Sequence, residues 1–136
     1  MGLADESTVE EKEGIGDQML YFAFRVPKKN HDAMVQGAKK ANELFRKLGV
    51  LRSLFQLNNI KTYEDMGFTN IAKTMSASQD EEEIWLQLMF FSDRRHMEEW
   101  MSKGEKDETM NKLFQEFMEL ITPGSCIEGE FGRLKV

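Results

Sequence analysis

The sequence is poor in cysteine and in long apolar runs, and each absence excludes a class of protein. Cys126 is the single cysteine, so no disulfide can form within the chain and a reducing, cytoplasmic location is expected. No stretch approaches the roughly 20 apolar residues of a membrane-spanning helix. The acidic, polar N-terminus has neither the basic nor the apolar part of a secretory signal. We therefore expect a cytoplasmic protein without a membrane partner.

Motifs that hold metals or phosphates are missing as well. The chain has no His-x-x-x-His pair and no paired cysteines, so we expect no metal site. It has no glycine-rich phosphate loop, and we expect no bound cofactor. No neighbour in sequence would lower the pKa of the Cys126 thiol, so Cys126 is expected to be a small buried hydrophobic residue rather than a nucleophile.

Basic residues are outnumbered, with 18 lysines and arginines against 24 aspartates and glutamates. Residues 1–17 hold six of the acidic residues and one lysine, so most of the formal net charge of −6 lies there. Neither part of the chain offers a surface for a polyanion, and we expect no nucleic-acid partner. Residues 1–17 also lack apolar periodicity, which predicts a mobile acidic tail ahead of a single domain over residues 18–136.

The first half of this domain is predicted to contain two strands and a helix. Apolar residues alternate over residues 19–26, as a strand requires. A helix follows, because apolar residues recur at spacings of three and four; Asn30 is placed to cap it and Gly49 to end it. A second strand is predicted over residues 50–57.

The second half begins with a stretch that has no strong pattern. Residues 60–82 form either a functional loop or a missed element, and residues 70–75 fit a short helical turn. The remaining elements are a strand, two helical segments separated by Gly104 and a last strand, at residues 83–91, 93–102, 107–121 and 126–131. The order β-α-β-β-α-β predicts an α+β, ferredoxin-like fold, with a four-stranded antiparallel sheet and helices on one face.

The strand at residues 83–91 is apolar on both sides. Its even-numbered row is apolar throughout, and its odd-numbered row combines Gln87 with three large apolar residues, Trp85, Met89 and Phe91. We assign the odd-numbered row to the face without helices, beside Tyr21 of the first strand. An apolar face of this size is unusual for a monomer, so a second copy is expected to cover it in a homodimer.

Polar residues fall on the same face by alternation: Arg25, Arg52, Gln56, Gln87, Glu128 and Glu130. Between two packed sheets they would form either a structural ion-pair network or a pocket for a small molecule. The pocket residues predicted in the second case are Tyr21, Arg25, Arg52, Trp85, Gln87 and His96.

Four motifs carry a resemblance to a known family: Phe24-x-Val26-Pro27, Leu48-Gly49-Val50, the strand 84–91 with Ser92-x-Arg94-x-His96, and Ile127-x-Gly129-x-Phe131. Residues 20–132 resemble the YbaA-like family of small bacterial proteins, within the dimeric α/β-barrel superfamily. The resemblance implies the ferredoxin-like fold, a sheet-to-sheet dimer and, by analogy with cofactor-independent monooxygenases, a cavity between helices and sheet. Thr69, Glu128 and Glu130 depart from the family pattern.

Three functions remain open, and the sequence leaves undecided whether the chain is an enzyme. The leading hypothesis is a homodimeric, cofactor-free protein that binds a small molecule in a cavity beside the sheet. The alternative is a monooxygenase-type enzyme in which His96 is the base and Arg25 or Arg52 holds an enolate-like anion. The third is a purely structural or partner-binding dimer.

Overall fold

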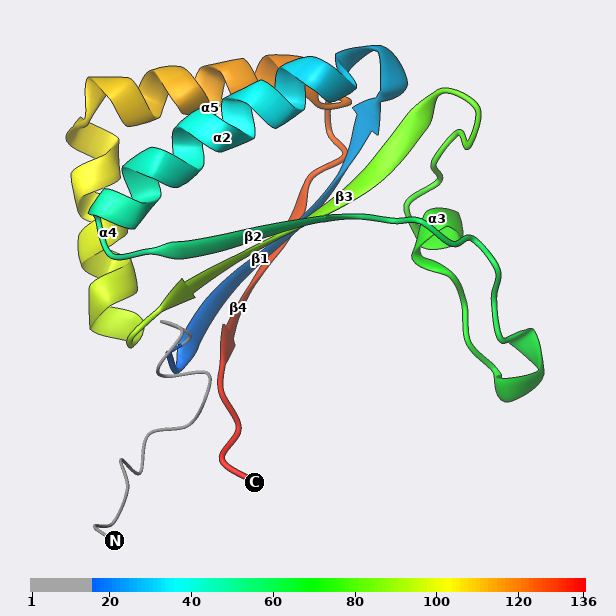
Figure 1. Cartoon of the computed structure of the whole chain (residues 1–136). Coiled ribbons are helices and arrows are strands. Elements are labelled where there is room, and N and C mark those ends of the chain that lie inside the picture. The colour runs from blue at the N-terminus through cyan, green and yellow to red at the C-terminus, as the bar shows by residue number, and fades with distance from the viewer. Residues whose placement is uncertain (1–15) are drawn as a thin grey trace, which may run out of the picture.

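A computed structural model describes residues 16–136, which form one antiparallel sheet with helices packed on one of its faces (Figure 1). The four strands are β1 (Gln18–Pro27), β2 (Leu51–Gln56), β3 (Glu82–Phe91) and β4 (Ile127–Gly132). They are ordered β2-β3-β1-β4 across the sheet, and each neighbouring pair is antiparallel. The predicted α+β class and four-stranded antiparallel sheet are confirmed.

Three long helices cover one face of the sheet. They are α2 (His31–Lys47), α4 (Arg94–Lys106) and α5 (Glu108–Leu120). Helices α2 and α5 lie side by side above the strands, and α4 turns away from α5 at one end (Figure 1). Short elements complete the chain: η1 (Lys28–Asn30), η2 (Glu64–Met66) and α3 (Ile71–Thr74). The element order is therefore longer than a plain β-α-β-β-α-β sequence.

The helix boundaries follow local capping chemistry. Gly49 has a positive φ of 75° and ends α2, with its N–H bonded to Arg46 O and that of Val50 to Phe45 O. The turn predicted at residues 70–75 is confirmed as α3, which Asn70 caps by accepting the Ala72 N–H at 2.9 Å.

Two details of the predicted helices are wrong. Asn30 stands at the N-cap position of α2, but its side chain does not cap the helix; it donates to Leu120 O at 2.8 Å and so ties α2 to the end of α5. Gly104 does not break α4, which continues to Lys106. The break lies at Asp107, which leaves helical geometry and caps α5 by accepting the Met110 N–H at 2.9 Å.

The pairing of β1 with β3 corrects the predicted faces of the sheet. Leu20 lies opposite Met89, and Phe24 lies opposite Trp85, so the odd-numbered row of β3 shares the face of Leu20 and Phe24. That face is the one covered by the helices, because Trp85, Met89 and Phe91 are buried there by the chain itself. The same registers place Arg52, Gln56, Gln87, Glu128 and Glu130 on the helix side of the sheet. Their predicted position on the face without helices is wrong.

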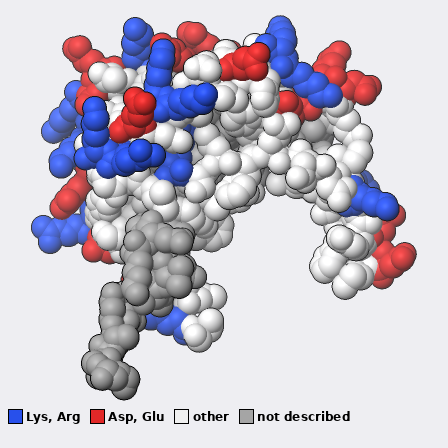
Figure 2. Space-filling model, viewed as in Figure 1, with Lys and Arg blue, Asp and Glu red and all other residues white. Residues whose placement is uncertain are grey.

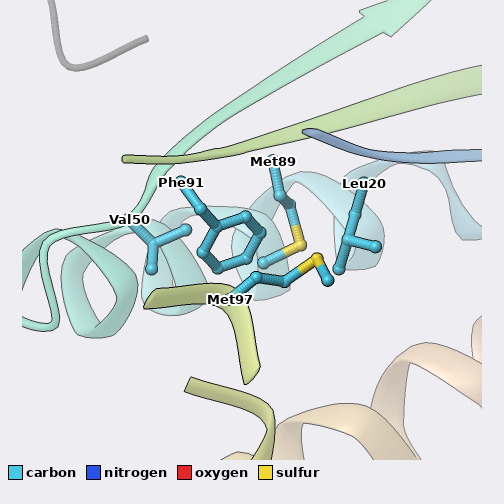
Figure 3. Packing of buried hydrophobic residues seen from close by; sticks show 5 residues of the cluster. All are labelled: Leu20, Val50, Met89, Phe91 and Met97. Carbon is cyan, nitrogen blue, oxygen red and sulfur yellow. The ribbon is translucent and has the colours of Figure 1, made fainter. Parts of the chain in front are cut away.

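The core on the helix side consists of two separate clusters. The first contains Leu20, Val50, Met89, Phe91 and Met97, with the Phe91 ring between Val50 and the two methionines (Figure 3). The second contains Phe24, Val26, Met34, Trp85 and Ile121. Phe22 is partly buried and packs against both clusters. The helix layer is therefore held to the sheet at two places rather than along one continuous core.

The acidic tail predicted for residues 1–17 falls outside the described residues, apart from Gly16 and Asp17. The backbone N–H of Asp17 donates to Ser92 O at 3.2 Å, and Asp17 O accepts from the N–H of Arg133 at 2.8 Å. The residue before β1 is thereby hydrogen-bonded to the residues that follow β3 and β4.

Candidate functional site

A cavity of about 750 Å³ lies between the sheet and the helix layer. It is lined by Leu20 and Met89 of the first cluster, by Met34 and Phe117 around the second, and by Phe22, which contacts both. Helix α5 covers it loosely, since none of the α5 residues is fully buried. Ligand pockets in proteins usually measure about 300–1,000 Å³, so the cavity is large enough for a small molecule.

The lining of the cavity is mainly apolar. Its large side chains are mostly aromatic rings and methionines, among them Phe45, Trp100, Phe117, Met34, Met101 and Met110. Methionine side chains adapt to different shapes because they are unbranched and polarisable. The charged side chains Lys40, Glu105, Glu116 and Glu119 also border the cavity, but they are exposed and mark its solvent rim.

Two polar side chains, one buried and one half-buried, lie on the sheet side of the cavity. Arg52 of β2 and Gln87 of β3 project from neighbouring strands on the same face, and Arg52 Nη2 donates to Gln87 Oε1 at 2.7 Å. The Gln87 amide nitrogen has a weak partner, the Met89 Sδ atom at 3.3 Å. Gln87 therefore keeps donor capacity within an apolar enclosure.

The charge of Arg52 has no carboxylate partner among the described residues. Nη1 donates to two neutral acceptors, Ala38 O at 3.4 Å and Asn42 Oδ1 at 3.2 Å. The Nε–H group is buried and finds no acceptor within residues 16–136. Burial lowers the pKa of the Arg52 guanidinium to about 10, so the side chain remains a cation at neutral pH.

Trp100 of α4 provides a second donor without an acceptor at this cavity. Its indole Nε1 is buried and has no hydrogen-bond partner in the part of the chain that the structure describes. The indole packs against Phe45 and Phe91, with ring centroids 5.4 Å and 5.5 Å away, and the Phe45 ring in turn lies 5.4 Å from the Arg52 guanidinium carbon. The cavity thus combines one buried cation with a surplus of hydrogen-bond donors.

The structure brings together Arg52 and Gln87 of the six predicted pocket residues and separates the other four from them. Trp85 is buried in the second cluster, where its Nε1 donates to Glu83 at 2.9 Å, and it does not line the cavity. Tyr21 and Arg25 lie on the helix-free face, where Arg25 forms an ion pair with Glu82 at 3.0 Å. The six residues therefore do not share one pocket in this chain.

His96 stands at the first turn of α4, outside the cavity lining. Its backbone N–H donates to Asp93 at 2.8 Å, and its Nδ1 lies 3.2 Å from both the backbone nitrogen and the hydroxyl of Ser92. These contacts fasten the end of β3 to the start of α4. The catalytic role of His96 stays a prediction.

Phe45 and Trp100 are cavity residues that sequence reasoning assigned only to helix packing. Each belongs to an apolar helical stripe, and nothing in the stripe distinguishes a wall of a cavity from a solid core. Within residues 16–136, no group of three or more His, Cys, Asp or Glu side chains is placed to hold a metal ion. None of the helices in that range has the length and apolarity needed to cross a membrane.

The helix-free face of the sheet is the second notable surface. Leu51, Phe55, Ile127 and Phe131 project from it and are exposed, and Met19, Tyr21, Leu86, Leu88 and Phe90 are half-buried there. The ion pair of Arg25 with Glu82 contributes the only charged side chains among the described residues of these strands that point to this side. Figure 2 shows a hollow on this side of the molecule, formed largely by uncharged residues.

Most of the chain also matches one known family. The family described as "Protein of unknown function (DUF1428)" matches residues 19–120, from the start of β1 to the end of α5. No curated protein matches the chain. The matched region includes every element that lines the cavity and leaves out β4.

Proposed function

The chain belongs to the DUF1428 family, and from that premise we propose that it is a homodimer in which each subunit binds one small, largely apolar molecule. The binding site is the cavity between the helix layer and the sheet. The two sheets face each other in a dimeric α/β barrel built from ferredoxin-like subunits. No cofactor is required for binding, and the protein acts as a binding module rather than through the side chain of His96.

The observation that carries this proposal is the cavity itself. A monomer of this size normally fills its core to the density of an organic crystal. Here about 750 Å³ stays open in the middle of the helix–sheet interface, between two well-packed clusters. An apolar lining with a few convergent polar groups is typical of small-molecule sites.

The helix-free face supports the homodimer. A second copy offers the same apolar and nearly uncharged surface, so no charge would be buried without a partner when two such faces meet. Phe55 and Phe131 are each about half exposed, at 54% and 49%, and aromatic rings of this kind contribute strongly to interfaces.

Binding is tested with the neutral fluorophore N-phenyl-1-naphthylamine and a variant that fills the cavity. Gly37 of α2 lines the cavity, and apart from its own helix no atom lies within 4 Å of the position of a Cβ. The wild type should bind the probe saturably, at one molecule per subunit, and Gly37→Phe should reduce binding at least tenfold. Lys39→Phe places the same ring on the exposed side of α2 and should bind like wild type.

A wild type that fails to bind the probe would contradict the proposal, and so would a Gly37→Phe variant that binds it as well as the wild type. Circular dichroism and thermal unfolding of the variants show that each one is folded, so that a loss of binding reports the cavity rather than the fold.

The dimer is tested by sedimentation equilibrium at micromolar concentration. The wild type should sediment as two subunits, and Leu88→Glu, in the middle of the helix-free face, should sediment as one because a carboxylate would be buried without a partner. Met118→Glu introduces the same charge on the exposed side of α5 and should remain dimeric. If the wild type sediments as a monomer, the proposed dimer is wrong, while the proposed binding of a small molecule in the cavity is unaffected.

A further inference from the structure

We propose that the natural ligand of the cavity is an amphipathic monocarboxylate, whose apolar body fills the cavity and whose carboxylate is held by Arg52. The inference rests on the proposed binding function and adds the chemical class of the ligand. It follows from three features of the lining: an uncompensated cation on the sheet side, donors without acceptors, and a rim that holds all the other charged residues.

The uncompensated cation is Arg52. A buried guanidinium is normally paired with a carboxylate, because the loss of hydration is offset only by an opposite charge and several hydrogen bonds. Here its three acceptors are a backbone carbonyl and the side-chain amides of Asn42 and Gln87, all neutral. The missing partner of this cation is an anion, and the cavity is the space in which that anion can lie.

The surplus of donors points to the same chemistry. Arg52 Nε and Trp100 Nε1 are buried without acceptors, and the Gln87 amide nitrogen reaches only a thioether sulfur. Buried donors in folded proteins nearly always have partners. Neighbouring atoms cover Arg52 Nε and Trp100 Nε1, so an acceptor in the cavity would reach them after the two side chains turn toward it. A carboxylate suits them well, since it accepts several hydrogen bonds and matches the planar fork of an arginine in a bidentate pair.

The rest of the lining restricts the ligand to a single negative charge. Beyond Arg52 and Gln87 the wall is mainly apolar, with aromatic, methionine and aliphatic side chains that favour an apolar body. The rim holds three carboxylates, of Glu105, Glu116 and Glu119, against the single cation of Lys40, so its excess of negative charge would repel a second carboxylate near the opening. The chain as a whole is acidic, with a formal net charge of −6, so a preference for an anion would have to come from the site itself.

Displacement of N-phenyl-1-naphthylamine from the full-length protein tests the inference with matched acids and esters. The probes are dodecanoate and 2-naphthoate, each compared with its methyl ester. We expect at least one of the acids to bind the wild type about tenfold or more tightly than its ester, as charge-assisted hydrogen bonds require. In Arg52→Met the difference should vanish while the fluorophore still binds. Arg46→Met removes an equal charge from the exposed side of α2 and should keep the difference.

Each outcome decides between the two proposals. A wild type that binds the fluorophore but prefers neither acid to its ester would overturn the inference and leave the proposed function standing. A wild type that does not bind the fluorophore would overturn both. If Arg52→Met fails to fold, Arg52→Lys takes its place; it keeps the charge but loses the planar fork, so the preference for the acid should fall severalfold, and an unchanged preference would contradict a role for the guanidinium.

Discussion

Arg52 donates from Nη2 to Gln87 Oε1 at 2.7 Å, and this bond joins a buried cation on β2 to a neutral amide on β3. It is the shortest of the three contacts that satisfy the guanidinium, the others being 3.2 Å and 3.4 Å long. The guanidinium is therefore held by one short bond to a neutral acceptor and by two longer ones. Removing Arg52 and removing Gln87 should therefore change the free energy of unfolding by different amounts.

Gln87→Leu is expected to destabilise the protein by about 2 kcal/mol, because it leaves the buried Arg52 cation without its best acceptor. Arg52→Met is expected to change the free energy of unfolding by less than about 1 kcal/mol, since it removes the charge together with its desolvation cost. Urea unfolding without added ligand measures both values. In the double variant most of the loss caused by Gln87→Leu should be recovered; simple additivity of the two changes would contradict this account.

The same substitution at two glycines of the α2 region should have opposite effects. Gly37 lies inside α2 with free space around its Cβ position, so Gly37→Ala should stabilise the protein by about 0.5–1 kcal/mol. Gly49 has a φ of 75°, so Gly49→Ala should destabilise it by about 1–2 kcal/mol. Thermal unfolding of the two variants gives the sign of each change in stability. Two changes of the same sign would show that backbone conformation does not determine the effect of alanine at these positions.

His31 predicts a dependence of stability on pH. The hydrogen bond and charge of Glu83, at 2.8 Å from Nδ1, raise the pKa of His31 above its usual value of 6.5. Since the folded pKa is raised, this stabilisation is complete below pH 6.5 and is lost as the pH rises through the folded value. Unfolding midpoints should therefore fall over that range in the wild type, by more than in His31→Gln. Equal pH profiles, or a folded pKa at or below 6.5 in an NMR titration, would count against the pair.

Phe91 should be among the most sensitive positions of the first core cluster. Its side chain is fully buried between Val50 and two methionines, so Phe91→Ala should cost about 3–5 kcal/mol and leave a cavity. Phe114→Ala removes the same ring from an exposed position on α5 and should cost well under half as much. Similar losses in the two variants, measured by urea unfolding, would mean that the helix layer is not anchored at Phe91.

Most elements of the fold could be predicted from local chemistry. Alternation in β1, the left-handed glycine after α2 and the caps at Asn70 and Asp107 each depend on residues close in sequence. The end of α4 was harder to predict, because Gly104 lowers helix propensity without forcing a break. Helix packing decides whether such a glycine stays in the helix.

The faces of the sheet could not be predicted in the same way. Both rows of β3 are apolar, so alternation says that residues 84 and 85 point to opposite sides but not which side carries the helices. Only the pairing of Leu20 with Met89 decides this, and it is a contact between distant parts of the chain. Arg52 and Gln87 share one face, as predicted by alternation, but it is the opposite face of the sheet. The family resemblance implied a cavity between helices and sheet, whereas the helical stripes alone do not predict one.

The two hydrophobic clusters on the helix side share little beyond the Phe22 ring. A ligand bound between the two clusters would add contacts to both of them. The two parts of the helix layer would then unfold together rather than separately. Slow amide exchange across α2 and α5 would then be a property of the loaded state, and the empty protein would open these helices far more often than its strands.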